Sequence, residues 1–441
     1  PLGSDGRKFK GRVVFQGNRV VNQSWEAAVF QDLGNSPATM DASRAADCFG
    51  CFPGHKTEIA DAVQAYIHLR LKGNRCWICL PPDRRPPGAA GMRKPVFELF
   101  QALYGHPDSG SFWEEHCDKY CKEAGFEPLG IEWPSTYRHK TLGLFLVVYV
   151  DDFKLSGPKE NLAKGWALLR KTLVTGKETG QGQYLGCGHE AGTFKMPDGS
   201  VASSVSYNME SFWDSCVQRY MDLAGPNVRM KVVPTPFLIE DSSKGPAGAP
   251  CASGPISECP WCAHTFAPIV FRDLDEYNKM NKKDVPTGKV LGGNETSLSG
   301  GDSAGHTKPQ IKGRLAEHAA CILMKCLYGA RMARFDLLRA ITSLACQLTR
   351  WTPECDRKLH RLMCYIHTSK HLRMIGYVGN SLNEVQPHLF ADADFAGCAT
   401  TQRSTSGLHL CIRGSKTCFP IAGQSKRQGC VSHSTPEAEI V

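Results

Sequence analysis

Apolar positions along this chain follow two spacings, which predict strands in some segments and helices in others. The longest apolar run, from Leu142 to Val150, covers nine residues rich in Leu, Val and aromatic side chains, as is typical of a buried strand. Asp151 and Asp152 follow directly, and 153–157 is then the returning strand of a hairpin. The run is too short to cross a bilayer, so the pattern predicts no membrane span.

Helical spacing predicts several amphipathic helices. In the clearest, 109–125, Phe112, His116 and Tyr120 recur at a spacing of four residues. Similar patterns predict helices over 211–223, 317–332, 336–351 and 355–367, and further strands are expected over 9–15, 77–80 and 387–392. Strands and helices mixed in this way, with the Asp-Asp hairpin central, predict an α+β fold.

Residues 239–313 break this pattern. They are low in apolar residues and rich in Gly, Ser and Pro, which is typical of a flexible insertion. Within it, Cys259 and Cys262 form a single Cys-x-x-Cys, with Cys251 and His264 nearby. This group is either a zinc site or a set of loop cysteines, because no second pair completes four ligands.

Composition narrows the class of protein. The 441 residues are enough for two or three domains, and 41% hydrophobic with 22% charged residues predicts globular cores. The 20 cysteines are scattered, which favours reduced, buried thiols in an intracellular protein. No charged-then-apolar leader is visible at the N-terminus. We therefore expect an intracellular protein with no membrane partner.

The net charge of +9 is concentrated in one segment. Between Lys312 and Arg373 there are 12 Lys or Arg and 4 Asp or Glu, a net charge of +8. Such a basic segment suits a phosphate backbone. An ordinary basic helical surface explains it equally well.

Asp151 and Asp152 carry the first candidate chemistry. Two adjacent carboxylates set against an apolar strand cost free energy unless a cation neutralises them. Carboxylate oxygens are the ligands that Mg²⁺ prefers. The pair is therefore either a metal site or a solvated Asp-Asp turn.

Four motifs, which occur along the chain in the order typical of one family, add to this picture. They are Tyr149-Val150-Asp151-Asp152, Asp61-x-x-x-Ala65-Tyr66, Leu103-Tyr104-Gly105 followed by Trp113, and a C-terminal series made of 391–397, 403–407, 425–428 and 437–439. Together they resemble the reverse transcriptase and ribonuclease H region of copia-type LTR retrotransposon polyproteins.

The resemblance implies a right-hand polymerase followed by a helical connection and a truncated ribonuclease H-like domain. The expected divisions are fingers and palm over 1–180, a thumb-like region over 181–238, the flexible insertion over 239–313, the connection over 314–385, and a partial ribonuclease H-like domain over 386–441.

The implied activity is RNA-directed DNA polymerisation, in which deoxynucleoside triphosphates are added to a primer on an RNA or DNA template. This chemistry uses two Mg²⁺ ions about 3.5–4 Å apart, and Mn²⁺ is an alternative metal. By the resemblance, Asp61 and Asp151 would bind both ions, and Asp152 would support the primer-side ion.

The resemblance also implies a nucleotide site. Arg12 would face the triphosphate, Tyr66 would lie under the sugar and exclude a 2′-hydroxyl, and Tyr149 would pack near the primer end. One departure is Asp108, which stands where the family commonly has a glutamine that contacts the nucleotide. An anion at this place would lower nucleotide affinity unless another contact replaces the glutamine.

Asp392 and Glu439 match two ribonuclease H carboxylates, with Asp394 and Glu437 as weaker candidates. The remaining catalytic aspartates of the family would lie downstream of Val441. We therefore expect no RNA cleavage by this chain.

Two other hypotheses stay open. A degenerate or domesticated copy would bind nucleic acid without catalysis, which Asp108 and the insertion support. An unrelated metal-binding protein would share the motifs by accident. A polymerase of this class is expected in a cytoplasmic particle, in the nucleus, or in both, and its oligomeric state does not follow from the sequence.

Overall fold

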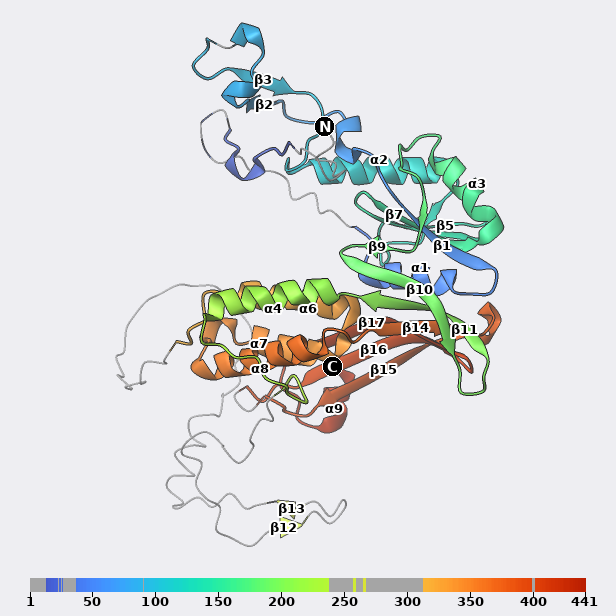
Figure 1. Cartoon of the computed structure of the whole chain (residues 1–441), viewed down its shortest axis with the longest axis vertical. Helices are drawn as coiled ribbons and strands as arrows, with labels where there is room; N and C mark the ends of the chain where they lie inside the picture. Colours follow the sequence, from blue (N-terminus) through green and yellow to red (C-terminus); the bar gives the residue numbers. More distant parts are fainter. Residues whose placement is uncertain are drawn as a thin grey trace, which may run out of the picture. The chain divides into compact units, whose positions relative to one another are not determined.

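The computed structural model describes residues 13–22, 24, 26, 37–89, 91–237, 257–258, 265–266, 312–398 and 401–441. The chain divides into two compact units, one formed by 1–237 with 313–441 and the other by 238–312. In the second unit the described residues form a short antiparallel pair, β12 (Ser257–Glu258) and β13 (Thr265–Phe266). Cys259 and Cys262 lie outside the described residues. The first unit mixes helices with two large sheets, which confirms the α+β class (Figure 1).

The first sheet has six antiparallel strands in the order β4-β5-β6-β7-β1-β8. Its central hairpin is the expected one, with β6 at Leu144–Tyr149 and β7 at Asp152–Pro158. The other strands are β1 (His55–Asp61), β4 (Glu127–Pro128), β5 (Thr136–His139) and β8 (Thr179–Gly180).

Helices cover both faces of the six-stranded sheet, which explains why β6 is apolar at successive positions. Leu146 and Phe153 pack into one core with α2 (Ser109–Glu123) and α3 (Lys159–Leu169). Val147 points to the opposite face and packs against α1 (Met40–Gly50). Strand alternation thus divides the hairpin between two layers.

The second sheet has seven strands in the order β15-β16-β17-β14-β11-β10-β9. The strands come from two distant segments: β9 (Gln183–Tyr184), β10 (Cys187–Lys195) and β11 (Val201–Asn208), then β14 (Met374–Val378), β15 (Gln386–Asp394), β16 (Thr405–Gly414) and β17 (Thr417–Arg427). The join is the pairing of β11 with β14. Residues expected in the thumb-like, connection and ribonuclease H-like regions therefore share one sheet.

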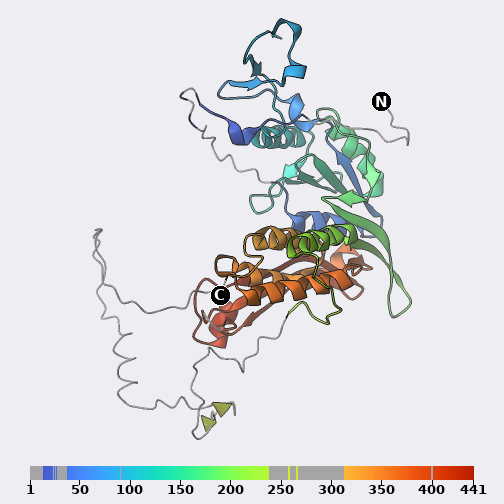
Figure 2. The same ribbon diagram turned by 60° about the vertical axis from the view of Figure 1, so that its left-hand side comes forward.

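Four helices pack with this second sheet around the largest core (Figures 1 and 2). They are α4 (Glu210–Ala224), α6 (Ala319–Ala333), α7 (Leu338–Ala345) and α8 (Pro353–Ser369). Fully buried Leu323, Ile341, Leu359 and Phe419 lie in this core. Helix α1 contacts strands of both sheets, so it is the layer that they share.

Two small elements complete the first unit. A ribbon of β2 (Cys76–Cys79) and β3 (Val96–Leu99) forms a separate antiparallel pair, and α9 (Thr435–Ile440) packs against β15. Short 3₁₀ turns lie at 17–19, 65–68, 82–84, 87–89 and 382–384. No helix in the described part of the chain is long and apolar enough to cross a membrane.

Most of the expected elements are confirmed, and two are wrong. The pattern over 336–351 is not one helix but a 3₁₀ turn, α7 and a second 3₁₀ turn at Leu348–Arg350. The chain leaves the helix because Trp351, 4% exposed, has extended backbone and is buried in the core. The expected strand over 9–15 is also wrong in its described part, where Val13 is 73% exposed and only Phe15 bonds a neighbour, through its amide to the Tyr104 carbonyl.

Candidate functional site

Strand pairing brings two of the expected catalytic carboxylates together. Asp61 ends β1 and Asp152 begins β7, and the register of the two strands places them directly opposite each other. A backbone hydrogen bond also joins the two segments here, since the Ala62 amide donates to the Asp151 carbonyl at 2.6 Å. Residues far apart in the sequence thus meet at one end of the six-stranded sheet.

The turn that carries Asp151 has an unusual backbone. Val150 has a φ of 55°, a left-handed conformation that is costly for a β-branched residue. The indole Nε1 of Trp113, on α2, donates to the Val150 carbonyl at 2.6 Å. The tryptophan of the third motif therefore holds the turn of the first motif.

Positive charge only partly balances these carboxylates. Burial, followed by the negative charges of Asp151 and Asp61 and a side-chain hydrogen bond with Asp61, raises the pKa of Asp152 to about 6, and the charge of Lys154 opposes this shift. A half-buried carboxyl group in this state has excess negative charge around it. A bound cation would relieve that charge.

The fit of this site to magnesium is a fit of chemistry and charge. All three candidate ligands are carboxylates, which Mg²⁺ prefers. However, no three His, Cys, Asp or Glu side chains among the described residues already converge as a metal-binding group. Asp61 and Asp152 are adjacent, and the three carboxylates would have to come closer together to form a complete ligand set.

Tyr66 lies near Asp151, whose charge acts on it. It sits in the 3₁₀ turn Ala65–His68 that follows β1, with its ring 4.7 Å from that of Tyr104 in an edge-to-face contact. Burial and the charge of Asp151 raise its pKa. A small cavity of about 30 Å³, lined in part by Tyr66, Trp113 and Val150, lies below the turn.

The other nucleotide-site residues are less well placed by the structure. Tyr149 ends β6 opposite Asp152 and is half-buried, whereas Arg12 lies outside the described residues. Asp108 precedes α2 without capping it, and its amide donates to His106 Nδ1 at 3.3 Å.

The glycine of the Leu-Tyr-Gly motif has a packing role. Gly105 has a φ of 87°, and a Cβ atom there would stand 2.2 Å from the Phe15 carbonyl oxygen. Only glycine allows this approach of two backbones. The motif therefore docks the segment around Phe15 against the start of α2.

A second pair of carboxylates lies at the edge of the seven-stranded sheet. Asp392 is exposed on the edge strand β15, and Glu439 of α9 accepts a hydrogen bond from the Ala393 amide at 3.3 Å. Asp394 pairs instead with Arg339 at 2.7 Å, and Glu437 accepts from the His433 amide at 2.7 Å. An open cavity of about 530 Å³ is lined by residues that include Phe390, Asp392, Asp394, Arg339 and Ser425.

The basic segment is engaged in contacts within the protein. Five of its cations form ion pairs: Arg334 with Asp336, Arg339 with Asp394, Arg357 with Glu354, Lys370 with Asp214, and Arg373 with Glu210. Three of these pairs, those of Arg339, Lys370 and Arg373, join separate elements of the fold, which weakens the case for a phosphate-binding surface here.

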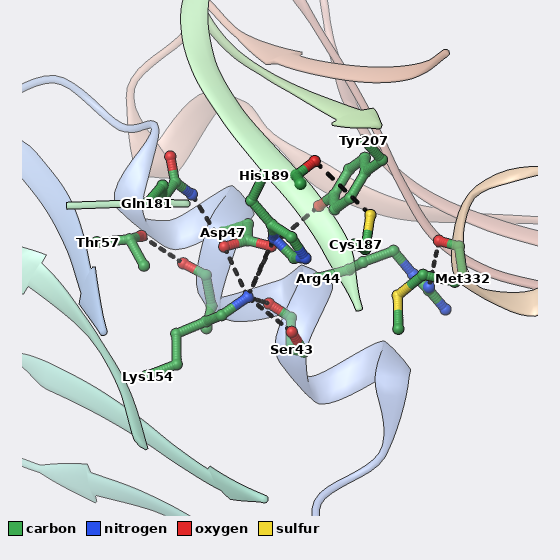
Figure 3. Close-up of polar contacts among 12 residues, drawn as sticks. Ser43, Arg44, Asp47, Thr57, Lys154, Gln181, Cys187, His189, Tyr207 and Met332 are labelled. Carbon is green, nitrogen blue, oxygen red and sulfur yellow. Dashed lines mark hydrogen bonds and ion pairs between the residues drawn. The ribbon is translucent and has the colours of Figure 1, made fainter. Parts of the chain in front are cut away.

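A buried ionic cluster, which the sequence patterns did not predict, lies behind the carboxylate site (Figure 3). Asp47 of α1 lies at its centre, with Lys154 of β7 and His189 of β10 against it at 2.9 Å each. The available indication was Lys154 itself, a charged residue within an apolar strand. Such a residue predicts a buried counter-charge.

Comparison with known proteins gives no match, either among protein-family models or among curated proteins. The retrotransposon resemblance thus stays a prediction that rests on the motifs.

Proposed function

We propose that this chain is an RNA-directed DNA polymerase of the copia retrotransposon type, with a fingers, palm and thumb arrangement, that extends a primer on an RNA or DNA template. The observation that carries the proposal is the meeting of Asp61 and Asp152 across β1 and β7, with Asp151 next to them and excess negative charge around Asp152.

In this proposal the chain holds magnesium through Asp61, Asp151 and Asp152. Bound Mg²⁺ would supply activation of the primer 3′-hydroxyl and charge stabilisation for the leaving pyrophosphate. Trp113 keeps the turn in place through the Val150 carbonyl, so that the ligands are held before substrate arrives. Tyr66 would contact the sugar of the incoming nucleotide.

The ribbon of β2 and β3 supports a nucleic-acid partner. Trp77 of β2 and Phe100, which directly follows β3, are 48% and 67% exposed, and the Arg75 guanidinium lies 5.3 Å from the centre of the Trp77 ring. Residues 70–101 contain seven Lys or Arg and two Asp or Glu, a net charge of +5. Exposed aromatic rings within a basic element suit single-stranded nucleic acid, whose bases stack and whose phosphates pair with cations.

A second candidate is a nucleic-acid-binding chain without catalysis. The absence of a ready three-ligand metal group among the described residues favours it, as does Asp108 near the expected nucleotide. This candidate keeps the ribbon as the binding surface and gives the carboxylates no role.

Primer extension separates the two. The chain is incubated with a primed RNA template, deoxynucleoside triphosphates and Mg²⁺, beside a variant with Asp151→Asn and Asp152→Asn. We expect extension that the variant loses while it still binds the primed template. Binding by both proteins without extension by either would favour the second candidate.

A further inference from the structure

Strand β7 carries an unusual row of polar residues on one face. Asp152, Lys154 and Ser156 alternate with buried Phe153 and Leu155, so the three polar side chains point to the face covered by α1. Lys154 and Ser156 are fully buried. A line of polar groups thus runs from the carboxylate site into the interior.

The ammonium group of Lys154 is held from several directions (Figure 3). It donates to Asp47 Oδ1 and Oδ2 at 2.9 and 3.0 Å and to Ser43 Oγ at 2.7 Å. It also lies 4.1 Å from the centre of the Tyr184 ring, a cation–π contact. Together these contacts hold the Lys154 side chain in a single conformation.

Asp47 is in turn fixed by the second sheet. His189 Nδ1 lies 2.9 Å from Asp47 Oδ2 and must carry the proton, because a carboxylate only accepts. The Tyr207 hydroxyl and Gln181 Nε2 also donate to Asp47, at 3.1 and 2.9 Å. Burial alone would raise the pKa of Asp47, but Lys154 and His189 hold it well below its usual range.

Helix α1 is anchored on its other side as well. Arg44 is buried, and it donates to the Ile421 carbonyl of β17 at 2.5 Å and to the Met332 carbonyl of α6 at 3.2 Å. Helix α1 is therefore bonded both to the seven-stranded sheet and to β7, and it fixes the position of β7 relative to that sheet.

Stability alone does not explain this cluster. A buried ion pair contributes little more to stability than a well-packed apolar pair of the same volume, and often less. It does impose direction and distance through its hydrogen bonds. Lys154, which these hydrogen bonds hold in place, is two positions from Asp152 on the same face of β7.

We propose that Lys154 is a positioning residue of the carboxylate site: anchored by Asp47, it fixes β7 against α1 so that Asp152 stays beside Asp61. This inference rests on the proposed function. Lys154 acts through the strand and does not itself contact substrate.

Two variants and a matched control test it. Lys154→Met keeps the length of the side chain and removes the ion pair, and Asp47→Asn with Lys154→Met also removes the unpaired buried carboxylate. The control is Ser156→Ala, which breaks the buried hydrogen bond between the Thr57 and Ser156 hydroxyls, 3.0 Å long, on the same two strands farther from the site.

We expect Lys154→Met to lower kcat for primer extension about tenfold or more, as loss of supporting interactions around metal ligands does, with a smaller change in KM for the nucleotide. The double variant should recover the thermal midpoint without recovering kcat. Ser156→Ala should lower the thermal midpoint and leave kcat unchanged. If kcat recovers together with stability in the double variant, Lys154 has only a structural role and the proposal is wrong.

Mn²⁺ binding, measured by calorimetric titration, gives an independent readout. Removing a nearby cation would by charge alone tighten Mn²⁺ binding, whereas misplacing Asp152 would weaken it. We expect binding about tenfold weaker in Lys154→Met, and equal or tighter binding would overturn the proposal. If the wild-type chain binds Mn²⁺ through Asp152 but extends no primer, the polymerase function fails and this titration alone decides the positioning role. A chain that does neither overturns both.

Discussion

The two carboxylate pairs of this protein differ in how they are assembled and in the charge around them. Asp61, which is exposed, and Asp152, which is half-buried, meet across neighbouring strands, and burial with like charges raises the pKa of Asp152 to about 6. Asp392 is exposed on an edge strand, and its partner Glu439 bonds a backbone amide. Beside them, Asp394 is already neutralised by Arg339.

The difference shows where a cation would gain most. Binding of a divalent ion is favoured where carboxylates are held close and partly desolvated without a resident counter-charge. At the first pair Asp152 is half-buried and the charge of Lys154 only partly offsets the neighbouring carboxylates, whereas at the second Asp392 is exposed and Asp394 is paired with Arg339. Catalysis is thus expected at the first pair and not at the second.

The strongest test makes the same Asp→Asn substitution in each of the two carboxylate pairs. Asp152→Asn is expected to reduce primer extension about a hundredfold or more, because charge stabilisation of the transition state depends on the metal ligands. Asp392→Asn should leave extension unchanged. Equal losses in both variants would remove the distinction between the pairs.

A second test asks whether nucleic acid reaches the first pair by way of the ribbon. Trp77→Ala with Phe100→Ala should weaken binding of a single-stranded template about tenfold or more, because each stacked base contributes about 1–3 kcal/mol. The matched control is Ile131→Ala, which removes a 96% exposed apolar side chain from the loop between β4 and β5. Fluorescence anisotropy at several salt concentrations measures both, and no difference between them would exclude the ribbon.

A smaller effect concerns stability and pH. The pKa of Asp152 is raised from 3.8 to about 6 in the folded chain, so between these values the folded state binds more protons than the unfolded state. Its contribution to the free energy of unfolding is then lost as the pH rises from about 4 to about 6. Without metal, the thermal midpoint of Asp152→Asn relative to wild type should increase across this range.

Added Mg²⁺ should close that gap above pH 6, because the ion stabilises the ionised carboxylates of the wild-type chain and has fewer ligands in the variant. A difference in thermal midpoint that does not depend on pH would mean that the pKa of Asp152 is not raised in the folded chain.

The smallest expected effect is at the second pair. The chain should not cleave the RNA strand of an RNA–DNA hybrid, and Glu439→Gln should change nothing. RNA cleavage that this substitution abolishes would make the second pair a working site and the comparison wrong. Gel analysis of a labelled hybrid is sufficient for this measurement.

Local pattern predicted local structure well here. Apolar spacing predicts the hairpin of β6 and β7, whose strands are buried on both faces. It also predicts the helices α2 and α8, each of which is buried on one face. The pairing of Asp61 with Asp152 came only from the resemblance, since no local spacing connects β1 to β7.

Long-range features were missed for the same reason. Nothing in the periodicity of β11 indicates that its partner is β14, more than 160 residues later. Apolar spacing predicts only that Lys154 belongs to a hairpin strand, whereas its partners Asp47 and His189 lie in two other segments of the chain. Such contacts are properties of the assembled fold, which neither propensity nor spacing encodes.

The seven-stranded sheet has a consequence for synthesis of the protein. Because β11 pairs with a strand made after the whole of 238–312, a nascent chain that ends anywhere in this insertion presents an open strand edge. Closing the sheet must then wait for β14, and contacts of such high sequence separation form slowly. The interval between the two strands is thus the period in which the emerging polypeptide is most exposed to aggregation, and in which a chaperone would have the most to protect.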